Sequence, residues 1–103
     1  MIKDIKNRVS EGNYRFTIHG LERCIERNIS PNDIEHAILS GEIIEDYPED
    51  KYGPSILILG RTEKGEILHI QCSVEPMWII TAYNPTLRPN EWDNDFRRRI
   101  KKS

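Results

Sequence analysis

A run of three closely spaced β-rich segments between residues 55 and 83 constrains the fold more than any other feature of the sequence. Residues 55–60 (SILILG) are apolar on both sides, which predicts a central strand. Residues 66–74 (EILHIQCSV) alternate, and residues 77–83 (MWIITAY) follow after a tight connection. Residues 42–47 (EIIEDY) predict a further short strand. We therefore expect an antiparallel sheet of about four strands.

The alternation in residues 66–74 gives this strand an apolar face and a more polar face. The apolar face carries Leu68, Ile70, Cys72 and Val74. An antiparallel hairpin centred near residue 75 places His69 opposite Thr81, and it brings Tyr83 onto the same face. A register slip of one residue would separate these side chains. The polar face is thus expected to hold His69, Gln71, Thr81 and Tyr83.

Four other segments carry helical patterns. Residues 2–11 repeat apolar side chains at helical spacing, and residues 19–27 and 31–39 do so again. The third helix begins with the capping-box sequence SPND, which has proline at the first helical position. Asn90 is expected to cap a last helix, whose apolar residues are Trp92, Phe96 and Ile100.

The order of these elements predicts an α+β fold with N-terminal helices packed on one side of the sheet. Residues 14–18 are expected to form a short strand or an extended segment. Residues 1–103 form a single domain, and residues 93–103 form its basic C-terminal helix or tail. In the helix over 19–27, Leu21, Cys24 and Ile25 share one third of the wheel and are expected to face the sheet. The predicted core is Leu21, Ile25, Ile34, Ile38, Ile58, Leu68, Ile70 and Ile80.

Composition excludes several classes of function. No apolar run reaches the roughly 18 residues of a membrane span, and the N-terminus lacks a signal core, so we expect a cytoplasmic protein. Cys24 and Cys72 give neither zinc spacing nor a disulfide framework, and we expect no metal or cofactor. The net charge of −2 argues against a protein that coats polyanions generally. A local basic group remains at Arg97, Arg98, Arg99, Lys101 and Lys102.

His19, Arg23 and Arg27 recur in steps of four along the helix over 19–27. Arginine suits phosphate, and histidine exchanges protons near neutral pH, so this row is what phosphodiester chemistry needs. The alternative is an ordinary surface lattice of ion pairs with neighbouring glutamates. His69 and Tyr83 also have two interpretations, as site residues or as packed structural residues.

Longer strings of the sequence are similar to one family. They are YRFTIHGLERCIERNISPNDIEHAILSGEIIEDYPED, YGPSILILGRTEKGEILHIQCSV, WIITAYNP and EW. Together they resemble the bacterial and archaeal domain-of-unknown-function family 4258, over residues 14–92. Its layout is similar to that of RelE-like ribonuclease toxins, which implies a BECR-type two-layer fold and metal-independent cleavage. The family often has alanine after the histidine, where this chain has Gly20.

The resemblance implies the toxin of a toxin–antitoxin pair. The implied partners are RNA and a small antitoxin with a CxxC-type zinc finger, with no membrane or DNA partner. The expected reaction is attack of the ribose 2′-hydroxyl on phosphorus. We expect His19 to lie roughly 5–8 Å from His69 or Tyr83 around one site. The alternative is a non-catalytic protein- or RNA-binding module. The predicted catalytic residues are His19, Arg23, His69 and Tyr83, and the predicted RNA contacts are Arg27, Arg97, Arg98, Arg99 and Lys101.

Overall fold

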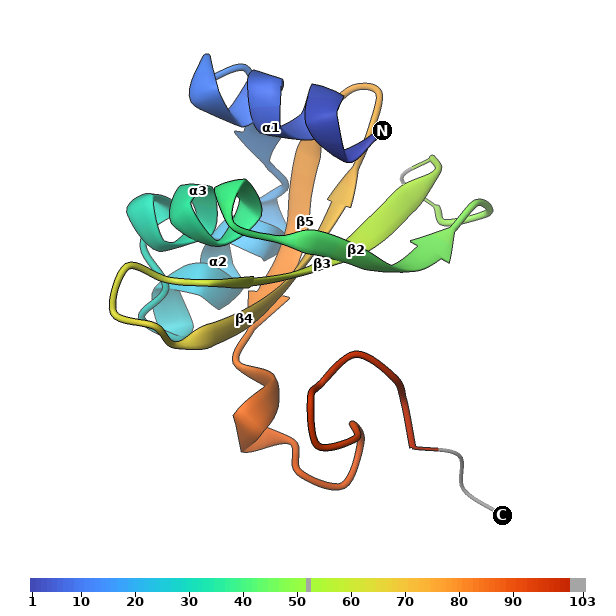
Figure 1. The fold of residues 1–103 in the computed structure, drawn as a ribbon. Helices are drawn as coiled ribbons and strands as arrows, with labels where there is room; N and C mark the ends of the chain where they lie inside the picture. The colour runs from blue at the N-terminus through green and yellow to red at the C-terminus, as the bar shows by residue number, and fades with distance from the viewer. Residues whose placement is uncertain (52, 101–103) are drawn as a thin grey trace.

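The computed structural model of the chain describes residues 1–51 and 53–100 (Figure 1). The helices are α1 (Ile2–Ser10), α2 (Ile18–Glu26), α3 (Pro31–Leu39) and the short 3-10 helix η1 (Pro85–Leu87). The strands are β1 (Arg15–Phe16), β2 (Glu42–Tyr47), β3 (Ser55–Arg61), β4 (Ile67–Ser73) and β5 (Trp78–Tyr83).

The strands form one sheet in the order β1-β5-β4-β3-β2. β2, β3, β4 and β5 are antiparallel neighbours, whereas the two residues of β1 run parallel to β5 at the edge. The sheet is therefore mixed and has five strands where about four were expected. The predicted α+β two-layer arrangement is confirmed.

Local signals set the helix boundaries. The Ser30 side chain accepts a hydrogen bond from the Asp33 amide at 3.1 Å, and the Asp33 carboxylate accepts one from the Ser30 amide at 2.9 Å. This reciprocal pair is the predicted capping box of α3. Thr17 caps α2 by accepting from the Gly20 amide at 2.9 Å. Gly12 adopts a φ of 71° directly after α1, where the chain turns into β1.

The helices cover one face of the sheet and enclose the main core. Five of the eight predicted core residues are buried there, together with Ile5 and Val9 of α1. Leu68 is 2% exposed on this face, and His69 points to the other, which confirms the predicted phase of β4. The five are Ile34, Ile38, Ile58, Leu68 and Ile70.

The predicted orientation of α2 is wrong. Leu21 and Ile25 are 45% and 69% exposed, and Ile80 of β5 is partly exposed, whereas Gly20 and Cys24 are buried. The reason is close approach: a Cβ on Gly20 would lie 2.4 Å from the carbonyl oxygen of Ile79. The helix thus presents its smallest residue to β5, which turns it by roughly a fifth of a turn from the orientation that its apolar residues predict.

The predicted register of β4 and β5 is displaced by two residues. His69 pairs with Tyr83 and Gln71 pairs with Thr81. An irregularity between Gln71 and Cys72 accompanies the shift, and the Ser73 hydroxyl donates to the Pro76 carbonyl oxygen at 2.6 Å in the connection. Because a shift of two preserves the side-chain faces, the predicted polar face survives.

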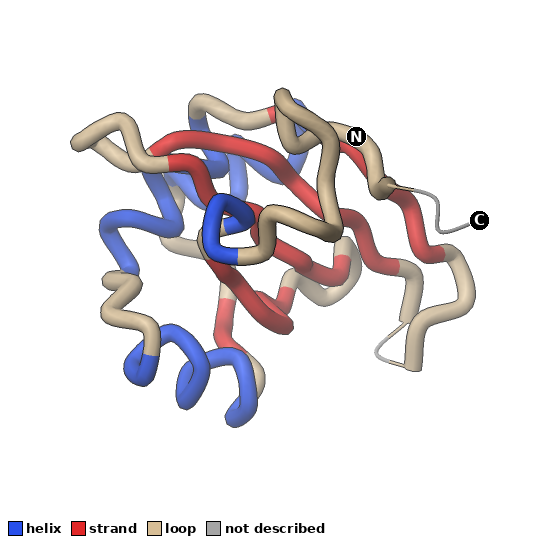
Figure 2. The backbone as a smooth tube through the Cα atoms, turned by 90° about the horizontal axis from the view of Figure 1, so that it is seen from below, coloured by secondary structure: helices blue, strands red, loops and turns tan. Residues whose placement is uncertain are grey.

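The predicted last helix is absent from residues 88–100, which we call the C-terminal strap. The Asp93 carboxylate accepts from the backbone amides of Arg97 and Arg98, at 3.1 and 3.3 Å, and Phe96 has a φ of 62°. These contacts bend the chain into turns, and an isolated bridge joins Trp92 to Arg99. Figure 2 shows the strap in front of the strands, on the side away from α1, α2 and α3. Lys101 and Lys102 lie outside the described residues.

Candidate functional site

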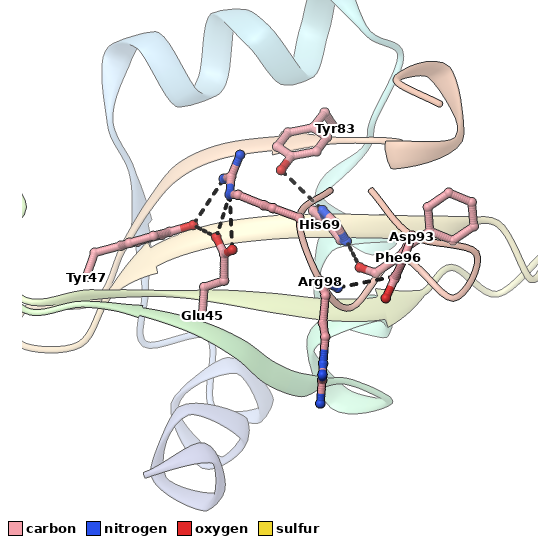
Figure 3. Close-up of polar contacts among 8 residues, drawn as sticks. Glu45, Tyr47, His69, Tyr83, Asp93, Phe96 and Arg98 are labelled. Carbon is pink, nitrogen blue, oxygen red and sulfur yellow. Dashed lines mark hydrogen bonds and ion pairs between the residues drawn. The ribbon is translucent and has the colours of Figure 1, made fainter. Parts of the chain in front are cut away.

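His69 occupies the centre of the face that the strap covers, and its side chain is fully buried. Its Nε2 lies 2.8 Å from the carbonyl oxygen of Phe96, and its Nδ1 lies 3.2 Å from the hydroxyl of Tyr83 (Figure 3). A carbonyl oxygen accepts only, so Nε2 carries the hydrogen and Nδ1 accepts from Tyr83. Burial lowers the pKa of His69, which favours the neutral imidazole.

Aromatic rings enclose the imidazole on two sides. The Trp92 ring centre lies 4.3 Å from that of His69, and the Tyr83 ring centre lies 5.3 Å away, both edge-on. The Arg88 guanidinium stacks over the Tyr83 ring at 4.0 Å. Burial raises the pKa of Tyr83, which keeps its hydroxyl protonated and able to donate to His69.

A second polar group adjoins this pair. Arg99 donates from Nε to the Glu45 carboxylate at 3.0 Å, and from Nη2 to the Tyr47 hydroxyl at 3.4 Å. Its guanidinium also lies 4.6 Å from the centre of the Trp92 ring. Tyr47 donates to Glu45, and burial with that hydrogen bond raises the pKa of Tyr47 to about 12. The cluster therefore combines an imidazole, two phenols, two guanidiniums and one carboxylate.

The structure does not bring His19 and Arg23 into this cluster. His19 is exposed on α2, where Nδ1 lies 3.9 Å from Glu22, and Arg23 pairs with Glu26 at 3.1 Å. Among the described residues, no hydrogen bond, ion pair or ring contact joins His19 to His69 or Tyr83. These contacts match the lattice of surface ion pairs that the sequence left open as an alternative.

Arg27 takes a different position from the other two residues of its row. It donates to the Ala82 carbonyl oxygen at 2.7 Å and to the Thr81 hydroxyl at 3.3 Å. With Tyr83 and Arg88, it lines a cavity of about 230 Å³ beside the end of β5. Arg27, which caps the C-terminal end of α2, thus reaches the neighbourhood of Tyr83.

Two of the predicted basic RNA contacts are engaged with acidic residues of β2. Arg97 pairs with Glu42 at 2.5 Å, and Arg99 pairs with Glu45. The Arg98 side chain is exposed, with its backbone amide bonded to Asp93. Lys101 lies outside the described residues. Arg97 and Arg99 therefore fasten the strap to β2.

Sequence reasoning missed four residues of the cluster: Glu45, Tyr47, Arg88 and Trp92. Glu45 and Tyr47 alternate along β2 in the pattern of one strand face, which was the available signal. Trp92 was expected on a helix, and its contact with His69 depends on the turns of the strap. Nothing local to Arg88 in the sequence indicates its position over Tyr83.

The described residues offer few other reactive groups. No three His, Cys, Asp or Glu side chains in residues 1–51 and 53–100 converge so that they could hold a metal ion. Both cysteines are buried thiols, and burial raises the pKa of Cys72 to about 12. Within the same part of the chain, no helix is long and apolar enough to cross a membrane.

Comparison with known proteins identifies a family for the central part of the chain. The sequence model of the domain of unknown function DUF4258 matches residues 16–84, a segment that runs from β1 to the residue after β5. No curated protein and no solved structure matches the chain. The matched segment includes His69 and Tyr83 and ends before the C-terminal strap. Because it covers well over half of the sequence, the chain belongs to the DUF4258 family.

Proposed function

We propose that this chain is a metal-independent endoribonuclease, the toxin of a toxin–antitoxin pair, that cleaves RNA by attack of the 2′-hydroxyl. The observation that carries the proposal is the hydrogen bond between His69 and Tyr83, which joins two strands beside two arginines. The proposed partner is a small antitoxin, which is inferred from the resemblance to RelE-like toxins. Catalysis is assigned to His69 and Tyr83, because contacts connect these residues and leave His19 apart.

The imidazole and the phenol together can move the two protons that the reaction requires. As the 2′-oxygen bonds to phosphorus, its proton passes to the Tyr83 oxygen, and the Tyr83 proton passes to His69 Nδ1. The bond from phosphorus to the 5′-oxygen breaks, and this oxygen receives the proton from His69 Nε2. One proton enters the imidazole and one leaves, so the products are a 2′,3′-cyclic phosphate and a 5′-hydroxyl. The lowered pKa of His69 keeps it neutral and ready to accept at neutral pH.

Fixed positive charge is available for the pentacoordinate phosphorus. Arg88 and Arg99 are both close enough to lower the pKa of His69. Arg27 and Arg88 line the same cavity as Tyr83, which gives a phosphate beside the phenol two forked donors. Such preorganised donors stabilise charge that develops in a transition state.

A specific observation favours a second candidate, the non-catalytic binding module. His69 is fully buried, and both of its ring nitrogens are already hydrogen-bonded. A histidine satisfied in this way stabilises a fold without any role in chemistry. In that case the chain binds RNA or protein through its surface, and the strap is a permanent part of the core.

Cleavage assays in excess EDTA separate the two candidates. Purified protein is incubated with single-stranded RNA, and the 3′ ends of the products are analysed. We expect cleavage without metal and ends that carry cyclic phosphate. RNA that is bound but stays intact would favour the binding module, and cleavage that requires added magnesium would contradict the proposed mechanism.

A further inference from the structure

The C-terminal strap makes His69 inaccessible in this structure. Trp92, which is 2% exposed, packs edge-on against the imidazole, and the Phe96 carbonyl oxygen accepts from Nε2. Nε2 is the atom that the proposed reaction needs for the leaving group. RNA therefore reaches His69 only after Trp92 and Phe96 have moved away.

Trp92 packs with Leu57 and Tyr83 in a second apolar cluster, and ion pairs fasten the strap to the body beside it. In the described residues, Trp92 and Arg99 are joined to each other by a bridge, and the strap adds no strand to the sheet. Its ion pairs to the body join Arg97 to Glu42, where both side chains are about half exposed, and Arg99 to Glu45, where the carboxylate side chain is 21% exposed. Exposed ion pairs contribute little to stability and weaken as salt rises.

The family match ends between the residues proposed to react and the strap that buries them. Residues 16–84 include His69, Tyr83 and Glu45, whereas the strap lies entirely beyond them. The residues proposed to react thus belong to the shared domain. The segment that occludes them is outside it and carries three of the arginines predicted to bind RNA, Arg97, Arg98 and Arg99.

We propose that the strap is a lid that RNA itself opens, because backbone phosphates compete with Glu42 and Glu45 for Arg97 and Arg99. This proposal rests on the proposed function. Arginine binds phosphate through paired, charge-assisted hydrogen bonds, so a polyanion replaces the carboxylates at both arginines. Release of Arg99 from Glu45 removes the cation stacked on Trp92 and frees the side of the strap that carries Phe96. RNA opens the lid because it binds the open state more tightly than the closed state.

The opening is measured separately from cleavage by fluorescence energy transfer. One dye is placed on the strap at Asn94→Cys and the other on the β3–β4 turn at Lys64→Cys, both exposed positions. The native cysteines are buried and stay unlabelled. The probe is a short single-stranded 2′-O-methyl RNA, which lacks the attacking hydroxyl and is not cut. A matched pair at Asn32→Cys and Lys64→Cys reports on the body alone.

We expect the probe to lower energy transfer in the strap pair and to leave the body pair unchanged. The midpoint should coincide with that of RNA binding measured by anisotropy. Glu42→Gln removes one competing carboxylate and should lower this midpoint by about two- to fivefold.

Each outcome decides one of the two proposals. Unchanged energy transfer in the strap pair at saturating probe overturns the lid, and cleavage of ordinary RNA under the same conditions would leave the ribonuclease intact. Opening by the probe without any cleavage of ordinary RNA supports the lid and overturns the ribonuclease. Absence of probe binding overturns the lid as well, because RNA is then not what opens it.

Discussion

Replacement of Gly20 by alanine tests how α2 sits on the sheet. The added Cβ would lie 2.4 Å from the Ile79 carbonyl oxygen and 2.9 Å from that of Ile80, distances that ordinary contacts do not reach. Overpacking of this kind costs about 1–3 kcal/mol, and the better helix propensity of alanine returns about 1 kcal/mol. We expect a net loss of up to about 2 kcal/mol in the free energy of unfolding, measured by urea denaturation followed by circular dichroism.

Leu21→Ala is the matched control on the same helix. Leu21 is 45% exposed, so its truncation should cost less than about 1 kcal/mol. If α2 had the orientation predicted from its apolar spacing, both results would be reversed. Leu21 would then be buried, and Leu21→Ala would lower the free energy of unfolding by about 2–5 kcal/mol. Gly20 would be exposed, and Gly20→Ala would stabilise the protein through its better helix propensity. That reversed pair of results would refute the close approach of α2 to β5.

Three further predictions concern stability. Leu68→Ala should cost about 2–5 kcal/mol in urea denaturation, because the side chain is 2% exposed in the main core, and a loss below about 1 kcal/mol would place it elsewhere. Ser30→Ala should cost about 0.5–2 kcal/mol by removing the bond to the Asp33 amide, and an unchanged thermal midpoint would contradict the capping box. The lowered pKa of His69 means that the unfolded chain binds more protons, so stability should be complete above about pH 6.5 and fall as the pH drops below it. His69→Gln should flatten this dependence and exposed His36→Gln should not, and equal slopes in both variants would contradict the buried neutral imidazole.

Patterns confined to one element predicted the structure well. The alternation in β4 indicated which face holds Leu68 and which holds His69, because a strand repeats every two residues whatever packs on it. The Ser30 and Asp33 signal identified the start of α3, because a capping box is satisfied within four residues.

Features that depend on distant contacts were not predictable from spacing alone. The orientation of α2 follows from Gly20 meeting carbonyl groups of β5, which lie about sixty residues away in the chain. Trp92 and Phe96 have helical spacing, but they do not lie on a helix. The Asp93 carboxylate accepts from the backbone amides of Arg97 and Arg98, which in a helix would donate to backbone carbonyl oxygens. The polar face of β4 and β5 was predicted from the sequence, whereas the packing of the C-terminal strap over this face was not.

The most direct test of the central claim is the single-turnover rate of RNA cleavage by Tyr83→Phe, measured with His36→Ala as control. Tyr83→Phe keeps the ring and removes the hydroxyl that lies 3.2 Å from His69, and His36 is exposed on α3. Loss of the proton relay should slow Tyr83→Phe by about 100-fold or more and leave His36→Ala at the wild-type rate. Equal rates for Tyr83→Phe and the wild type, with both proteins folded, would contradict catalysis by the His69–Tyr83 pair.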